Sequence, residues 1–165
     1  MIMPSRTPDS YTTNDIYDLP DGKRAGISTR LSSEIHQYIQ AHNGSCEVFT
    51  APFAVFLCKD DKNYVEPDIS IICDSGKIDD RGCNGAPDWI IEIVSPGSTR
   101  MDYFVKLFKY RTAGVREYWI VNPMKKTVQT YLFEGEEDSN QFSFEDTIPV
   151  GIYKDLQIRI DDLLL

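Results

Sequence analysis

Residues 87–94 read Pro-Asp-Trp-Ile-Ile-Glu-Ile-Val, an apolar run typical of a buried β-strand, with one glutamate, Glu92, inside it. A similar run stands upstream at residues 66–72, Glu-Pro-Asp-Ile-Ser-Ile-Ile, with Asp68 near its start. A charged side chain in such a run is costly to bury unless it binds a metal, pairs with a cation or reaches water at a strand end. We therefore expect Asp68 and Glu92 to lie on neighbouring strands, with their carboxylates close together.

The pattern on either side of these runs predicts an α/β fold. Apolar residues at spacings of three and four predict helices over residues 28–41 and 100–113. Strands are expected over residues 46–57, 66–73, 89–94, 117–121 and 127–133, with shorter ones at 142–144 and 156–160. A poorly structured N-terminal segment, residues 1–25, is expected to begin a single domain that spans residues 1–165. This order of elements implies a mixed β-sheet flanked by helices.

The second predicted helix carries both a start signal and a stop signal. Thr99, followed three residues later by Asp102, resembles a capping box, and Gly114 is the expected C-terminal stop. The apolar residues of this helix are expected to pack inward, namely Met101, Phe104, Val105, Leu107 and Phe108. The helix follows directly on the strand that holds Glu92, so Lys106 is expected near that carboxylate.

Asp68, Glu92 and Lys106 are the predicted catalytic residues. Hydrolysis of a phosphodiester needs a metal that activates water, so the two carboxylates are predicted ligands of Mg²⁺, with Mn²⁺ as a substitute. The Lys106 ammonium would orient the water or stabilise the transition state. Other interpretations stay open: Lys106 in a surface pair with Asp102, Glu92 in a buried structural ion pair, and Asp68 as a turn former. Asp88 shares a strand face with Glu92 and would support the site or simply begin the strand.

The chain resembles the Uma-two family of endonucleases, part of the PD-(D/E)XK restriction-endonuclease-like superfamily. The resemblance rests on residues 66–68, 85–96, 102, 106, 110, 113–119 and 122–123. It implies a restriction-endonuclease-like core of a helix, a three-stranded meander, a helix and a strand. Asp68 would be the motif aspartate and Glu92 the acid of the second half-motif. The simplest superfamily pattern has a lysine two residues after that acid, where this chain has Val94, so the resemblance gives that role to Lys106.

Residues 23–28, Lys-Arg-Ala-Gly-Ile-Ser, depart from the family pattern. Members of the family usually carry there a Tyr-Glu-Leu-type strand, a turn and a histidine-containing helix start, and the glutamate often joins the site. Either this chain lacks the element, or residues are missing between Arg24 and Ser28. Glu34, further along the helix, is a weak substitute for the absent acid.

The overall charge argues against a broad electrostatic surface for nucleic acid. The net charge is −9 and the pI is about 4.6, whereas affinity for a phosphate backbone comes largely from lysine and arginine. The acidity is concentrated in residues 134–138 and 161–162, which a substrate need not touch. The basic residues expected near the predicted site are Lys106, Lys109, Arg111 and Arg116.

The cysteines and the hydropathy bear on the environment of the protein. Cys46, Cys58, Cys73 and Cys83 lack the spacing of a zinc knuckle, and we interpret them as buried thiols in preference to disulfides or metal ligands. No apolar stretch approaches the roughly 20 residues of a membrane span, and the N-terminus does not resemble a secretory signal. We expect a cytoplasmic protein with no membrane partner.

Three functional hypotheses follow from these patterns. The first is a Mg²⁺-dependent endonuclease that hydrolyses DNA. The second is a catalytically weak or inactive binding module on a nuclease fold, acting through protein partners, which suits the acidic surface. The third is a hydrolase of a small phosphorylated substrate. A homodimer is also expected, because Tyr131 and Phe133 place aromatic side chains on a strand in the C-terminal half, although such faces more often belong to a core.

Overall fold

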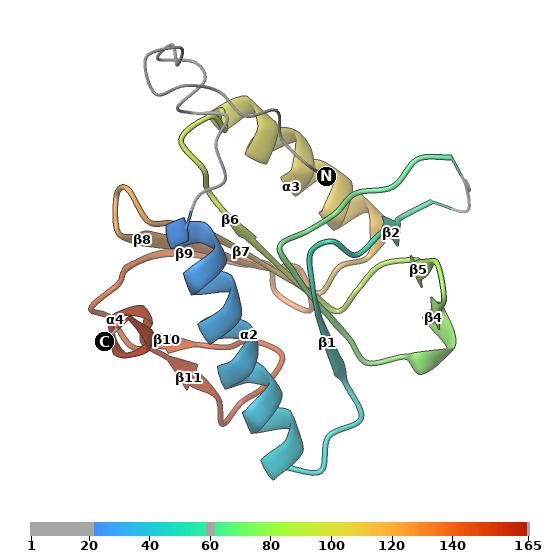
Figure 1. Ribbon diagram of the computed structural model, residues 1–165, viewed down its shortest axis with the longest axis horizontal. Coiled ribbons are helices and arrows are strands. Elements are labelled where there is room, and N and C mark those ends of the chain that lie inside the picture. Colours follow the sequence, from blue (N-terminus) through green and yellow to red (C-terminus); the bar gives the residue numbers. More distant parts are fainter. Residues whose placement is uncertain (1–21, 59–61, 165) are drawn as a thin grey trace, which may run out of the picture.

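The computed structural model describes residues 22–58 and 62–164. A six-stranded sheet with the order β1-β3-β6-β7-β8-β9 forms its centre (Figure 1). The strands are β1 (Glu47–Thr50), β3 (Ile69–Ile72), β6 (Trp89–Ile93), β7 (Glu117–Asn122), β8 (Thr127–Leu132) and β9 (Asp138–Ser143). Neighbours pair antiparallel except β6 and β7, which pair parallel and are joined through helix α3 (Arg100–Ala113). The predicted α/β fold with a mixed sheet is confirmed.

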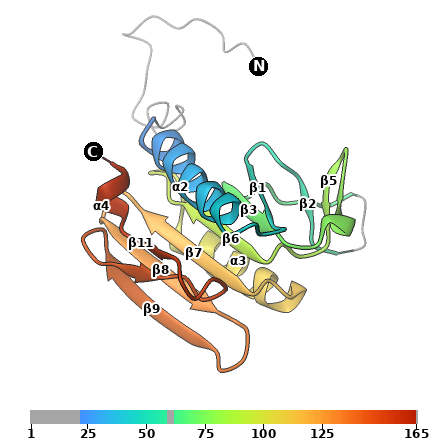
Figure 2. The same ribbon diagram turned by 90° about the horizontal axis from the view of Figure 1, so that it is seen from below.

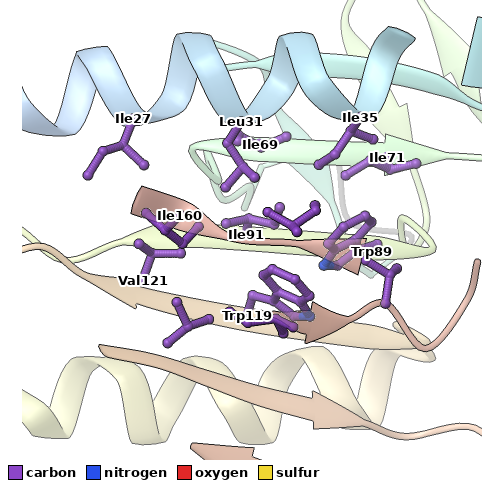
Figure 3. Packing of buried hydrophobic residues seen from close by; sticks show 14 of the residues in the cluster. Ile27, Leu31, Ile35, Ile69, Ile71, Trp89, Ile91, Trp119, Val121 and Ile160 are labelled. Atoms are coloured by element: carbon purple, nitrogen blue, oxygen red, sulfur yellow. The ribbon is translucent and has the colours of Figure 1, made fainter. Parts of the chain in front are cut away.

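Helix α2 (Gly22–Ala41) covers one face of the sheet, and α3 lies on the other (Figure 2). Four residues at intervals of four place one side of α2 on the sheet: Ile27, Leu31, Ile35 and Ile39. Under this helix, Ile69 and Ile71 of β3 meet Trp89 and Ile91 of β6 in one continuous core (Figure 3). Trp89 packs edge-on against Trp119 of β7, with ring centroids 5.0 Å apart. Alternation along the strands therefore sends residues 88, 90, 92 and 94 of the β6 region to the α3 side.

The first helix begins earlier than expected. It runs unbroken for 20 residues from Gly22, so residues 23–28 are helical and the strand of the family pattern is replaced here by helix. The prediction of poor structure is therefore wrong for residues 22–25, while residues 1–21 lie outside the described part of the chain. Ile27 explains the earlier start, because its buried side chain extends the apolar side of the helix by one turn.

The second helix is rotated relative to expectation. Its capping box is present, with the Thr99 hydroxyl accepting from the Asp102 backbone and the Asp102 carboxylate accepting from the Thr99 backbone. The predicted inward packing is wrong for four of its five apolar residues: the exposed ones are Met101 (66%), Phe104 (68%), Val105 (44%) and Phe108 (69%). Tyr110 is fully buried and Lys106 bonds to Glu92 of β6, so these two residues set the side of α3 that faces the sheet.

Smaller elements surround the central sheet. The predicted strand over residues 46–57 is divided into β1 and β2 (Val55–Phe56). Residues 74–85, which follow the second predicted strand, contain η2 (Ser75–Lys77), β4 (Ile78–Asp79) and β5 (Gly82–Asn84). Gly82 has φ +140°, and a Cβ there would lie 2.1 Å from the Ala54 carbonyl oxygen, so this approach of β5 requires glycine. At the C-terminal end lie β10 (Ile148–Pro149), β11 (Gln157–Ile158) and α4 (Ile160–Leu163). None of the helices in residues 22–58 and 62–164 has the length and apolar character that crossing a membrane requires.

The cysteines differ from the prediction of four buried thiols. Cys46 and Cys73 form a disulfide between the ends of β1 and β3. The pairing of Glu47 with Ile72 explains this bond, because one residue further along two antiparallel strands brings positions 46 and 73 opposite each other. Cys58 is a free but exposed thiol, and only Cys83 is both free and buried.

Candidate active site

Asp68 lies immediately before β3 and is 5% exposed. Its Oδ2 atom accepts a 2.7 Å hydrogen bond from the backbone nitrogen of Ile93 on β6, which fixes the carboxylate against the neighbouring strand. Its Oδ1 atom accepts from Arg24, 2.9 Å from Nε and 2.7 Å from a terminal guanidinium nitrogen. Both carboxylate oxygens are therefore held, one by the sheet and one by α2.

Glu92 lies in β6 with its side chain on the α3 side of the sheet and is 2% exposed. Its Oε1 atom accepts a 2.7 Å hydrogen bond from the Tyr110 hydroxyl, and its Oε2 atom lies 3.3 Å from Lys106 Nζ. Burial raises the pKa of Glu92 above its ordinary value, and the negative charge of Asp68 adds to the rise. Lys106 and Tyr110 act in the opposite direction on that pKa, because both stabilise the ionised carboxylate.

Asp68, Glu92 and Lys106, the three residues singled out from the sequence, are thus brought together. Lys106 binds Glu92, whereas the Asp102 carboxylate caps the start of α3, so the structure favours the contact with Glu92 over the alternative surface pair. Glu92 also satisfies the second alternative interpretation, a buried ion pair, since a catalytic and a structural carboxylate can share this geometry.

The remaining acidic candidates lie elsewhere. Asp88 accepts from the Cys73 backbone and from Arg116, contacts that join β3, β6 and the start of β7. Glu66 is exposed, and Glu34 lies ten residues beyond Arg24 on α2, about 15 Å along the helix axis. Glu34 therefore does not replace the acid that the family pattern has in this region.

Arg24 is the residue that the sequence did not reveal. It lies in the first turn of α2, in the segment where the family pattern predicts an acidic side chain, and it brings a cation to Asp68. Four residues then form a quartet of two acids and two bases: Arg24, Asp68, Glu92 and Lys106. The acidic side chains are only 7% and 3% exposed, while Arg24 is 40% and Lys106 35% exposed, so the two bases cover the two acids.

Two tyrosines of α3 complete the surroundings. Burial and the charge of Glu92 raise the pKa of Tyr110 far above its ordinary range, so its hydroxyl remains a donor at neutral pH. Tyr103 has its ring centroid 5.5 Å from Lys106 Nζ, in a cation–π contact. Tyr103 also lines a hollow of about 540 Å³ that runs past Val94 and Asn122, at the ends of β6 and β7. The hollow adjoins the quartet through Tyr103, and none of the four quartet residues lines it.

The donor set fits a small hard cation with few protein ligands. The described residues contain no group of three or more histidine, cysteine, aspartate or glutamate side chains that could hold a metal. Mg²⁺ is commonly bound through one or two carboxylates, with waters and substrate phosphates completing its octahedron. Asp68 and Glu92 meet that requirement once Arg24 leaves Asp68 Oδ1, and the partly exposed Arg24 side chain has solvent to move into.

The basic cluster expected beside the site is largely neutralised. Arg111 pairs with Glu137, with Nε 3.1 Å from Oε1, and Arg116 pairs with both Glu134 and Asp88. The acidic segment at residues 134–138, which was expected to lie away from the substrate, therefore contacts the end of α3 and the start of β7. This acidic segment neutralises two of the four cations that would have favoured a phosphate backbone.

Comparison with known proteins agrees with this fold. The family model Uma2, described as "Putative restriction endonuclease", matches residues 13–160. A crystal structure from Anabaena variabilis, described as a "putative nuclease belonging to DUF820", superposes with a TM-score of 0.70 at 23% sequence identity. The match covers 88% of this chain and 82% of that protein. No curated protein matches the sequence.

Proposed function

The chain belongs to the Uma2 family of restriction-endonuclease-like proteins, and from that premise we propose that it is a metal-dependent nuclease that hydrolyses DNA. One observation carries the proposal: Lys106 of α3 meets Glu92 of β6, beside Asp68. Two acids on adjoining segments of the sheet can hold a divalent cation, and a lysine beside them can stabilise the negative charge that develops during hydrolysis of a phosphodiester. The lysine reaches the acid from the helix, so Val94 does not argue against activity.

Asp68 and Glu92 are the residues that would hold the metal. A divalent cation supplies a water of lowered pKa and neutralises charge on the scissile phosphate. The protein contributes orientation: the Ile93 backbone fixes Asp68 and the Tyr110 hydroxyl fixes Glu92. Lys106 is partly exposed and places a positive charge at the mouth of the site, where negative charge develops during hydrolysis.

A plasmid cleavage assay with Mg²⁺ or Mn²⁺ tests the proposal. We expect Asp68→Ala, Glu92→Gln and Lys106→Ala each to reduce the cleavage rate by about 100-fold or more, in line with loss of a transition-state contact. The matched control is Lys109→Ala, an exposed lysine three residues along the same helix, which should retain wild-type activity. Wild-type activity in Lys106→Ala, or equal loss in Lys109→Ala, would contradict the assignment of the site.

Arg24 favours a second candidate, a binding module that no longer cleaves. A guanidinium bonded to Asp68 already supplies the positive charge that a metal would bring, and the net charge of −9 disfavours bare DNA. Such a protein would retain the fold and act through a protein partner.

Calorimetric titration with Mn²⁺ separates the two candidates. For a nuclease, we expect the wild type to bind and Arg24→Ala to bind more tightly, because the competing cation is gone, with no binding in Asp68→Ala. Arg30→Ala, which removes an exposed arginine from the same helix, should match the wild type. For a binding module, neither the wild type nor Arg24→Ala should bind the ion.

A further inference from the structure

The outward side of α3 carries a continuous apolar stripe made of Met101, Phe104, Val105 and Phe108. Spacings of three, one and three residues put all four on one side of the helix, and each is at least 44% exposed. A contiguous group of large exposed apolar side chains marks an interaction site more often than a solvent surface. The stripe therefore needs a partner from outside the described residues.

The contacts on the opposite side of α3 fix the outward orientation of the stripe. On the opposite side of α3, Tyr110 and Lys106 both contact Glu92, and the capping box fixes where the helix starts. Rotating α3 to bury the stripe would break both contacts with Glu92 and leave a nearly buried carboxylate without partners. The exposed stripe and the assembled quartet are thus two consequences of one helix orientation.

We propose that a second copy of this chain covers the stripe, with the two α3 helices antiparallel about a two-fold axis between Phe104 and Val105. The spacing is self-complementary about that point. It sets Met101 opposite the second copy's Phe108, and Phe104 opposite the second copy's Val105. A two-fold interface requires this property, because the same patch must serve both subunits.

The charges beside the stripe suit the same arrangement. Asp102 lies near the start of α3 and Lys109 near its end, both exposed and both on the same flank of the stripe. In the antiparallel pair the Asp102 carboxylate lies beside the second copy's Lys109 ammonium on each side of the axis. Antiparallel helix dipoles add a favourable term. Arg111, on the other flank, is already neutralised by Glu137.

The neighbouring surface extends the patch toward the size of a stable interface. A typical specific interface buries about 1,600 Å² in total, more than one helix pair supplies. Beside Phe108, an apolar hollow of about 530 Å³ is lined by Val55, Leu57 and Tyr64, and Tyr64 is 56% exposed. The second copy would cover this hollow together with the stripe, and the quartet on the opposite side of α3 would stay accessible.

Sedimentation velocity of the full chain over a range of concentrations tests the assembly. We expect a mass of twice 18.9 kDa for the wild type and a shift to the monomer for Phe104→Lys, with unchanged circular dichroism. The control Leu164→Lys adds the same charge at another exposed apolar residue, just after α4, which contacts α2 on the other face of the sheet, and this variant should stay dimeric. A wild type that is monomeric at every concentration, or a dimer that Phe104→Lys leaves intact, would overturn the proposal.

Cysteine cross-linking in a Cys58→Ser background tests the antiparallel register. Val105→Cys places two thiols next to the axis, so mild oxidation should give a covalent dimer on a non-reducing gel. Lys109→Cys is the positional control, because its two copies would lie about 13 Å apart along the helix axes and should not cross-link. Efficient cross-linking at position 109 with none at 105 would rule out this register.

Discussion

Helices α2 and α3 have similar apolar patterns, but the apolar side of α2 is buried and that of α3 is exposed. On α2, Leu31 and Ile35 are completely buried against the sheet, whereas on α3, Phe104 and Phe108 are more than two-thirds exposed. The difference lies in the other side of each helix. The sheet-facing side of α3 is taken by Lys106 and Tyr110, whose contacts with Glu92 are polar. An amphipathic pattern therefore shows that a helix has an apolar side, and the polar residues decide which way that side faces.

Truncating an apolar residue on each helix is the strongest test of this contrast. We expect Leu31→Ala to lower the free energy of unfolding by about 2–5 kcal/mol, because it leaves a cavity under α2. Phe104→Ala should change the free energy of unfolding of the monomer by less than about 0.5 kcal/mol. Urea titrations at a concentration where the protein is monomeric provide both values. Equal losses would mean that the side chain of Phe104 is covered within its own chain.

Two buried tyrosines, Tyr110 of α3 and Tyr118 of β7, allow a test of the polar contact on the sheet-facing side of α3. Tyr110→Phe removes the hydroxyl that donates to Glu92, so it should cost about 1–3 kcal/mol of unfolding free energy. Tyr118→Phe is the matched control, because the buried Tyr118 hydroxyl has no hydrogen-bond partner among the described residues. Thermal unfolding of the two variants should show a lower melting temperature for the first and no loss for the second.

The capping box is a smaller and purely local contribution to α3. Thr99→Ala removes the side chain that accepts from the Asp102 backbone, and we expect a loss of about 1 kcal/mol in unfolding free energy. Thr99→Ser keeps the hydroxyl and should recover most of that loss. Denaturant unfolding of the pair measures the difference, and identical values would show that the cap does not hold the helix.

The last expected effect is a pH dependence at Glu92. Burial gives this carboxyl a higher pKa in the folded chain than its ordinary value of 4.5, so the folded state binds the proton more tightly than the unfolded state. Its contribution to stability is therefore greatest at low pH and is lost as the pH rises above 4.5 through the folded pKa. We expect the unfolding free energy of Glu92→Gln, relative to wild type, to improve from pH 4 to pH 7. If the stability of Glu92→Gln relative to wild type falls over that range, the pKa of Glu92 is lowered in the folded chain and this prediction is wrong.

Much of the fold and part of the site can be predicted from the sequence. The apolar runs within residues 66–72 and 87–94 predict two adjacent buried strands, and the structure pairs Ile69 with Ile91 in that way. The convergence of Asp68, Glu92 and Lys106 was expected from strand position together with the family resemblance. These predictions succeed because they depend on local periodicity and on the order of elements.

The errors concern contacts between residues far apart in the chain. The bond between Arg24 and Asp68 joins residues 44 positions apart, and nothing local in residues 23–28 indicates it. The disulfide of Cys46 and Cys73 depends on the register of β1 and β3, which the spacing of cysteines does not fix. The rotation of α3 depends on Glu92, a residue of another element. Tertiary partners decided these features, and a pattern within one segment does not contain them.

The tryptophan pair gives the protein a built-in optical reporter. The chain has two tryptophans, Trp89 and Trp119, and both are fully buried in edge contact beneath α2. Their emission and their coupled near-ultraviolet dichroism therefore originate at one place in the core. Loosening of the packing between α2 and the sheet will change this tryptophan signal directly. Events confined to the outer side of α3 will leave the signal unchanged. A spectroscopist can thus observe one half of the molecule without any added dye.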